Sequence, residues 1–192
     1  KNALTGLLKL IVRLPLADCQ QKKAVAALYE LMPHGDVCGK AMGVDWKDEI
    51  SGEMTLAFSM LTVDGQHLEG VFDSRCPICA NEENTLKVIK ERMAEKGIVL
   101  HNDSMIPPHH VDGDSHFVKV LNQVYEEYTG LPGGCLAIGG GTYVHELEHG
   151  VAFGAAFPGT DNRMHGADEF AVIDELLASA KIFAQVIVEL CS

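Results

Sequence analysis

The C-terminal third of the chain carries residues whose spacing could hold a metal ion. His145-Glu146-Leu147-Glu148-His149 has H-E-x-x-H spacing, which on an α-helix places two imidazoles on one face to bind zinc, with the glutamate as general base. The run Gly139-Gly140-Gly141 and Gly150 leave only about two turns of helix for this pair. A zinc protease that uses His145 and His149 is therefore one alternative, and not the favoured one.

Cys76-Pro77-Ile78-Cys79 is a second candidate for chemistry, because C-x-x-C occurs in zinc sites and in thioredoxin-like redox motifs. The chain has six cysteines but no second C-x-x-C and no C-x-x-H close by, so a closed zinc site lacks ligands. Scattered cysteines are typical of reduced thiols rather than of a disulfide framework. We therefore interpret this segment as turn and core residues and expect a cytoplasmic protein.

Composition excludes several classes of protein. The 192 residues carry a formal net charge of −12 and are 47% hydrophobic, which is ordinary for a globular protein. A strongly acidic chain repels phosphate backbones, so we expect no nucleic-acid partner. No apolar run reaches the ~20 residues of a membrane span, so we expect no membrane partner. No basic, apolar leader opens the chain, so the sequence gives no sign of secretion.

The first half of the chain reads as helix, helix, strand, strand, helix, strand. Met54, Leu56, Phe58 and Met60 alternate with more polar residues, and Asp64-Gly65 predicts a two-residue hairpin turn. This order is that of a ferredoxin-like βαββαβ unit without its first strand; an α+β domain that never had that strand is the alternative. The expected helices cover 2–14, 18–32 and 81–96, and the last strand covers 98–101.

The second half begins after Pro107-Pro108, which can continue neither a helix nor a strand. We expect a helix at 115–129 and short strands at 135–138 and 151–157. A last helix would begin at 166–168. The second half as a whole would be a piece of a larger α/β structure, too small to enclose its own core. Its inward residues are expected to be Phe170, Ile173, Leu177, Ala180, Phe183 and Ile187.

The residues around H-E-x-x-H resemble the C-terminal signature of the di-zinc dipeptidase family. That family includes bacterial Xaa-His (carnosine-type) dipeptidases and dipeptidase V, and is related to zinc carboxypeptidases and aminoacylases. Asp73-Ser74-Arg75-Cys76-Pro77 resembles the D-I-R-Y-P strand end of its lid domain, with Ser74 and Cys76 replacing the usual residues, and Lys1-Asn2-Ala3 resembles the start of a lid helix. The matching C-terminal segments are Gly140–Tyr143, Val151–Gly154, Phe157-Pro158, His165 and Asp168-Glu169.

The resemblance implies a role for individual residues. His165 would be a ligand of one zinc ion. Arg75 would bind the C-terminal carboxylate of the substrate, to which a planar guanidinium is suited. Gly140, Gly141 and Thr142 would present backbone N–H and hydroxyl groups to the substrate. His145 falls where the family often has Arg or Lys, so on this interpretation H-E-x-x-H is accidental.

The resemblance also implies that most of the catalytic machinery lies elsewhere. The other zinc ligands and the general-base glutamate lie, in this family, upstream of the position of Lys1. We therefore expect the C-terminal part of a zinc-dependent dipeptidase, which hydrolyses dipeptides with a metal-bound hydroxide but is inactive as this chain alone. It would comprise an incomplete lid subdomain at 1–108 and part of the catalytic domain at 109–192. The alternative is a non-catalytic binding module that forms homo-oligomers through the edges of the lid sheet.

Overall fold

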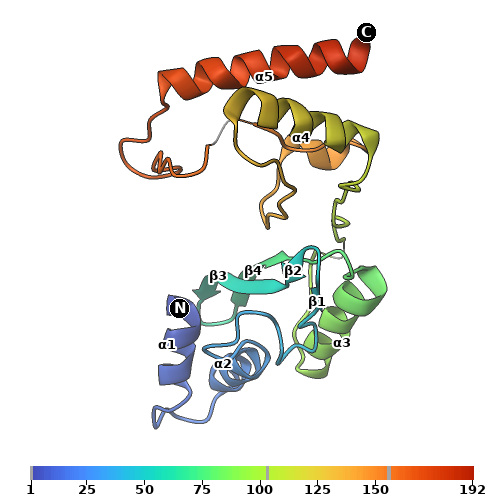
Figure 1. The fold of residues 1–192 in the computed structure, drawn as a ribbon. Helices are drawn as coiled ribbons and strands as arrows, with labels where there is room; N and C mark the ends of the chain where they lie inside the picture. Colours follow the sequence, from blue (N-terminus) through green and yellow to red (C-terminus); the bar gives the residue numbers. More distant parts are fainter. Residues whose placement is uncertain (1, 103, 155–156) are drawn as a thin grey trace. The chain divides into compact units, whose positions relative to one another are not determined.

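A computed structural model describes residues 2–102, 104–154 and 157–192 of the chain and divides it into two compact units (Figure 1). Unit 1 runs up to His109 and also contains Ala137–Gly140, whereas unit 2 comprises His110–Leu136 and Gly141–Ser192. The predicted α/β class is confirmed, because helices and small antiparallel sheets both occur. No helix of the described residues combines the length and apolar character needed to cross a membrane.

Two helices open unit 1. The α1 helix (Ala3–Ile11) begins at Asn2, whose side chain accepts the Thr5 N–H at 3.0 Å, and it packs against α2 (Gln20–Leu31) and β3 (Thr55–Val63). The predicted continuation of α1 to Pro15 is wrong. The N–H groups of Arg13 and Leu14 bond to the carbonyls three residues earlier, which tightens and ends the last turn.

The predicted hairpin is present as β3 and β4 (Leu68–Arg75), which pair antiparallel (Figure 1). Met54, Leu56 and Phe58 are buried as expected, but Met60 is 61% exposed. The register shifts between Phe58 and Met60, so Ser59 is an extra residue, and a bulge of this kind turns the following side chains to the other face. The prediction that Met60 faces the core is therefore wrong.

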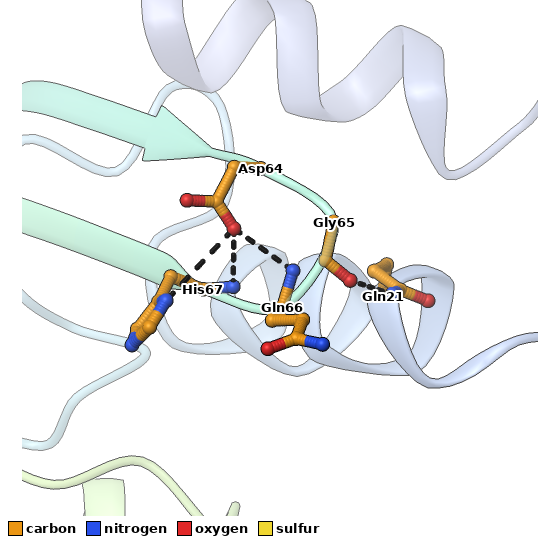
Figure 2. A network of polar contacts seen from close by, with 5 residues as sticks. All are labelled: Gln21, Asp64, Gly65, Gln66 and His67. Carbon is orange, nitrogen blue, oxygen red and sulfur yellow. Dashed lines mark hydrogen bonds and ion pairs between the residues drawn. The ribbon is translucent and has the colours of Figure 1, made fainter.

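The hairpin tip has four residues rather than the two predicted (Figure 2). The Asp64 carboxylate accepts the N–H groups of Gln66 at 2.8 Å and of His67 at 2.7 Å, which lowers the pKa of Asp64. The Asp64 N–H donates to the His67 carbonyl, and Gln21 of α2 donates its Nε2–H to the Gly65 carbonyl at 2.8 Å. The Asp64 carboxylate, as acceptor, thus stabilises the tip, and the Gln21 side chain, as donor, ties the tip to α2.

The remainder of unit 1 contains two very short strands and a helix. The strands β1 (Lys47–Asp48) and β2 (Gly52–Glu53) pair with one another. A capping box at Asn81 begins a π-helical turn, η1 (Glu82–Leu86), which continues into α3 (Lys87–Glu95), so the predicted helix with its Asn81 cap is confirmed.

The strand predicted at 98–101 is not formed. The N–H of Ile98 bonds to the Met93 carbonyl and that of Gly97 to the Ala94 carbonyl, which is the Schellman closure of α3. Because Ile98 completes the helix end, it cannot begin a ladder there, and the described strands of unit 1 form two separate two-stranded sheets. The core of unit 1 lies between the hairpin and the helices and includes Leu8, Leu28, Met42, Val44, Met54, Phe58, Ile89 and Met93.

Unit 2 is built on two helices, α4 (His116–Thr129) and α5 (Ile173–Cys191). Ser115 caps α4 by accepting the Val118 N–H, and Gly130 ends it with φ of 68°, so the predicted helix at 115–129 is confirmed. A small core of Leu121, Val124, Ile182 and Val186 joins the two helices.

The two strands predicted for the second half are not formed by described residues. The segment 135–138 has no regular secondary structure and is exposed, with Leu136 at 90% and Ile138 at 66% exposure. Of the segment 151–157, Ala155 and Ala156 lie outside the described residues, as does Lys1 at the start of the chain. The strands assigned in the described chain all lie between residues 47 and 75, so neither segment has an assigned neighbour to pair with.

The predicted inward face of the last helix is also wrong. Ser179, Ile182 and Val186 are the buried residues of α5, whereas Ile173 and Ile187 are 72% and 61% exposed. The α5 sequence is apolar around most of its circumference, so its periodicity favours no single face. Packing against α4 decides which face of α5 is buried.

Ser179 leads to a prediction about stability. Its hydroxyl is buried, and within the described residues it has no hydrogen-bond partner. Ser179→Ala should therefore raise the free energy of unfolding of unit 2 by about 1 kcal/mol, because an unsatisfied group is removed and alanine favours helix. Urea unfolding followed by circular dichroism measures the change. A lower stability of the variant would show that the hydroxyl does have a partner.

Candidate functional site

The side chain of Arg75 lies on the solvent face of the hairpin, at the end of β4. Asp73 and Arg75 are two positions apart on the strand and therefore point to the same face. They pair with Ala57 and Thr55 of β3, which are exposed, whereas the alternate β3 residues are buried in the core. The hairpin thus separates a core face from a charged face.

Asp73 holds the guanidinium of Arg75 through its Nε. The distance from Arg75 Nε to Asp73 Oδ1 is 3.1 Å, and the two side chains are 49% and 54% exposed. A bond at Nε leaves the two terminal nitrogens, which have no hydrogen-bond partner within the described residues. Two terminal N–H donors in one plane match the two oxygens of a carboxylate. Sequence reasoning missed the role of Asp73, which the D-x-R spacing on a strand could have indicated.

The structure brings the glycine turn and Arg75 together in unit 1. A Cβ placed on Gly139 would lie 3.5 Å from Cγ and 3.6 Å from Cβ of Arg75, so the stem of the arginine lies against this backbone. Gly140 follows, and the nearest atom to a Cβ placed there would be Cδ1 of Ile138, two residues earlier, at 4.0 Å. The arginine and the glycine predicted to bind substrate thus belong to one unit, with little side-chain bulk beside them.

Gly141 and Thr142 belong to unit 2, where Thr142 begins a 3₁₀-helix, η2 (Tyr143–Glu146). The N–H of Thr142 donates to Nδ1 of His145 at 3.2 Å, so this imidazole takes part in the cap. Leu147 is already extended, with φ of −112° and ψ of 112°. The α-helix that would place His145 and His149 on one face is therefore not formed, and the geometry of an H-E-x-x-H zinc site is absent from this described segment.

His165 lies in a loop with an unusual backbone. Arg163, His165 and Asp168 have φ of 57°, 62° and 57°, a region that L-residues adopt at a cost of about 1–2 kcal/mol each. The N–H of His165 donates to Glu169 Oε2 at 3.2 Å, and the Gly166 N–H donates to the Arg163 carbonyl at 2.7 Å. Backbone strain of this kind is concentrated at binding and catalytic sites. Sequence reasoning proposed His165 as a metal ligand but did not predict the left-handed backbone around it.

The described donors do not complete a zinc site. Among residues 2–102, 104–154 and 157–192, no three His, Cys, Asp or Glu side chains converge so as to hold a metal ion. His165 is exposed and can supply one imidazole, whereas a protein zinc site takes three or four ligands. The residues present therefore do not fit a resident zinc ion, and no catalytic step through zinc follows from them.

In the C-x-x-C segment, Cys76 is partly buried and Cys79 is exposed. Burial raises the pKa of the Cys76 thiol, which is the reverse of what a nucleophilic cysteine needs. The N–H of Cys79 donates to Asp48 Oδ2 at 3.4 Å, and the Ile78 N–H donates to Ser51 Oγ at 2.8 Å. All six cysteines are free. The segment is therefore a turn tied to the β1–β2 loop.

Comparison with known proteins relates the chain to dipeptidases, although no family model matches it. "Putative dipeptidase YtjP" of Bacillus subtilis is 41% identical over 157 residues, which is 81% of this chain and 33% of that protein. The Beta-Ala-Xaa dipeptidase of Lactobacillus delbrueckii subsp. lactis is 34% identical over 158 residues, 82% of this chain and 33% of that protein. "Putative dipeptidase SAR1836" of Staphylococcus aureus is 30% identical over 192 residues.

The relatives are much longer than this chain. The match to the Staphylococcus aureus protein covers 99% of this chain but only 40% of that relative. The chain thus spans roughly a third to two fifths of the length of these relatives. Proteins named as dipeptidases are therefore related to nearly the whole of the chain, while most of their own length has no counterpart in it.

Proposed function

We propose that this chain is the C-terminal part of a cytoplasmic metal-dependent dipeptidase. In this proposal, residues 1–108 form most of a lid subdomain and 109–192 form part of the catalytic domain. The observation that carries it is the packing of the Arg75 stem against Gly139, with Asp73 bound at Nε. The dipeptidase names of the relatives and the six free cysteines support it.

Arg75 would bind the free carboxylate of a dipeptide through its two terminal nitrogens. Asp73 is a positioning residue, because its bond to Nε fixes the plane of the guanidinium. The backbone at Gly139 and Gly140 would border the substrate, since glycine lets a ligand approach the main chain closely. Because Arg75 would require a free carboxylate on the substrate at this point, the enzyme would be restricted to short peptides with an unmodified C-terminus.

Hydrolysis would require groups that the described residues do not supply. His165, exposed on its loop, would contribute one of the several metal ligands that such a site needs. The remaining ligands and the general base would lie in the part of the longer protein that this chain does not match. We therefore expect no dipeptide hydrolysis by this chain alone, with or without added zinc.

Nuclear magnetic resonance of the chain with a β-alanyl dipeptide, the class in the printed name of the Lactobacillus relative, tests the proposal. We expect shifts of the Gly139 and Gly140 amides and of the Arg75 side chain, with a Kd on the order of 1 mM at so exposed a site. Arg75→Ala should weaken binding at least about tenfold, since a charge-assisted bidentate pair is lost. The C-terminal amide of the same dipeptide should not bind.

The matched control is Arg92→Ala, which removes an exposed arginine paired with Glu95 at 3.3 Å and should leave binding unchanged. If the chain binds the dipeptide and its C-terminal amide equally well, the proposed role of Arg75 is wrong. The same conclusion follows if Arg75→Ala binds the dipeptide as tightly as the wild type does. The same samples, with zinc added, report cleavage. Turnover by the purified chain would show that its catalytic groups are complete and would remove the C-terminal-part interpretation.

A further inference from the structure

The solvent face of the β3–β4 hairpin carries two apolar side chains close to Arg75. Met60 is 61% exposed and Val71 47% exposed, and the two residues pair across the hairpin. We call them the apolar pair. From the base of the hairpin towards its tip, the cross-strand pairs on this face are Thr55–Arg75, Ala57–Asp73, Met60–Val71 and Thr62–Glu69. The apolar pair is therefore the neighbour of Asp73 on the face that carries Arg75.

The bulge at Ser59 places Met60 on this face. Strict alternation after Phe58 would turn Met60 to the core face instead. The core face is filled at this point, because the ring of Phe58 lies over Gly70, where an added Cβ would be 2.7 Å from Cε2 of that ring. Bulges often re-aim a side chain beside an active site. This bulge adds an apolar side chain to the face of Arg75.

The apolar pair lies within reach of a ligand held by Arg75. The 3.1 Å bond from Arg75 Nε to Asp73 Oδ1 turns the guanidinium along β4 towards the hairpin tip, because Asp73 is the next residue on this face. Residues on one face of a strand are about 6.6 Å apart, and Val71 follows Asp73 at this spacing. A carboxylate bound beside the guanidinium would therefore lie about one spacing from the apolar pair, which a medium-sized amino-acid side chain spans.

We propose that Met60 and Val71 determine specificity for the C-terminal residue of the substrate, and that they favour dipeptides in which this residue is apolar. The inference rests on the proposed function, because Arg75 must hold the carboxylate of that same residue. An apolar surface of two side chains matches one ligand side chain, whereas a protein interface takes about 20–30 residues from each partner. Glu69 and Asp73 flank the apolar pair with negative charge, so an acidic C-terminal side chain would be disfavoured.

Nuclear magnetic resonance titrations of the chain with β-alanyl-leucine and with β-alanylglycine test this specificity. We expect β-alanyl-leucine to bind about fivefold more tightly, because part of its leucine side chain leaves water, and to shift the methyl signals of Met60 and Val71. Met60→Thr and Val71→Thr should each reduce this preference to about twofold or less and leave the affinity for β-alanylglycine unchanged. Both positions are exposed and threonine suits a strand, so the amide spectra of the variants should retain the dispersion of the folded chain.

Val99→Thr is the matched control, because it makes the same substitution as Val71→Thr at a 74% exposed position of unit 1 outside the hairpin, and it should keep the full preference. If both dipeptides bind equally and Arg75→Ala weakens both, the specificity proposal is wrong while the proposed function stands. If neither dipeptide binds, the role of Arg75 is wrong and the specificity proposal is wrong with it. A preference for β-alanyl-leucine that both threonine variants keep would also overturn the proposal, since another surface would then contact the leucine side chain.

Discussion

Replacing Gly39 with alanine is expected to lower the free energy of unfolding of unit 1 by about 3 kcal/mol. Gly39 is buried with φ of 80°, where an L-residue is strained by about 1–2 kcal/mol. A Cβ at this position would also lie 2.8 Å from Cγ2 of Val44 and 3.4 Å from Cδ2 of Leu56. Val44 is 0% exposed and has no room to retreat, so overpacking adds about 1–3 kcal/mol.

Gly35 provides the matched control for this prediction. It has φ of 101° but no atom within 4 Å of the position of an added Cβ, so Gly35→Ala carries the backbone strain without the clash. We expect it to cost about 1 kcal/mol, measured like Gly39→Ala by urea unfolding. The difference between the two variants isolates the contact with Val44. Equal losses would mean that the core around Val44 adapts to an added methyl group.

Local signals in the sequence predicted several helix ends in both units correctly. Asn81, Gly97 and Gly130 mark helix ends by side-chain capping and left-handed backbone, which depend on a few neighbouring residues. The hairpin was predictable from alternation, but the bulge at Ser59 was not, because it depends on how β3 pairs with β4. Met60 faces solvent for that reason.

Features that depend on distant partners were the ones that sequence could not predict. The α5 helix offers two apolar faces, and only its packing on α4 decides which is buried. Apolar runs such as 135–138 become strands only beside another strand, and the described structure assigns them none. Apolar periodicity therefore identified segments that could be buried, without identifying what would bury them.

In the candidate site, too, some features could be proposed from the sequence and others required the structure. Arg75, Gly140 and His165 were proposed as site residues because short segments around them resemble a family signature. The contact of Arg75 with Gly139 and the bond from Asp73 to Nε required three-dimensional structure. Arg163 is not a residue type that favours a left-handed backbone, and Asp168 is one that tolerates it without predicting it, so only the structure reveals both.

Asp36 organises the loop that carries Gly39. Its Oδ1 accepts the N–H groups of Cys38 at 3.2 Å, Gly39 at 2.9 Å and Lys40 at 3.1 Å, and its Oδ2 accepts that of Ala41 at 2.7 Å. The chain then enters the core at Met42, which is 0% exposed. One carboxylate therefore satisfies four backbone donors and fixes the entry of this segment into the core.

Asp36→Asn should lower the free energy of unfolding at neutral pH by about 2 kcal/mol, because an amide offers one acceptor oxygen and no charge. Partial burial raises the pKa of Asp36, but the N–H donors of Ala41, Lys40, Cys38 and Gly39 outweigh it, and the net pKa lies below the ordinary 3.8. A carboxyl whose pKa is lower when folded stabilises the protein fully above its unfolded pKa, and that stabilisation is lost as pH falls through the folded pKa.

The difference in stability between wild type and Asp36→Asn should therefore be constant above about pH 5 and shrink as the pH falls below about 4. Urea unfolding at a series of pH values measures it. Subtracting the variant removes the contributions of Asp48 and Asp64, whose pKa values are also lowered by hydrogen bonds. Asp18→Asn is the control, since that exposed carboxylate pairs only at the surface with Lys23. A difference that persists unchanged at low pH would show that the four N–H groups do not depend on the charge of Asp36.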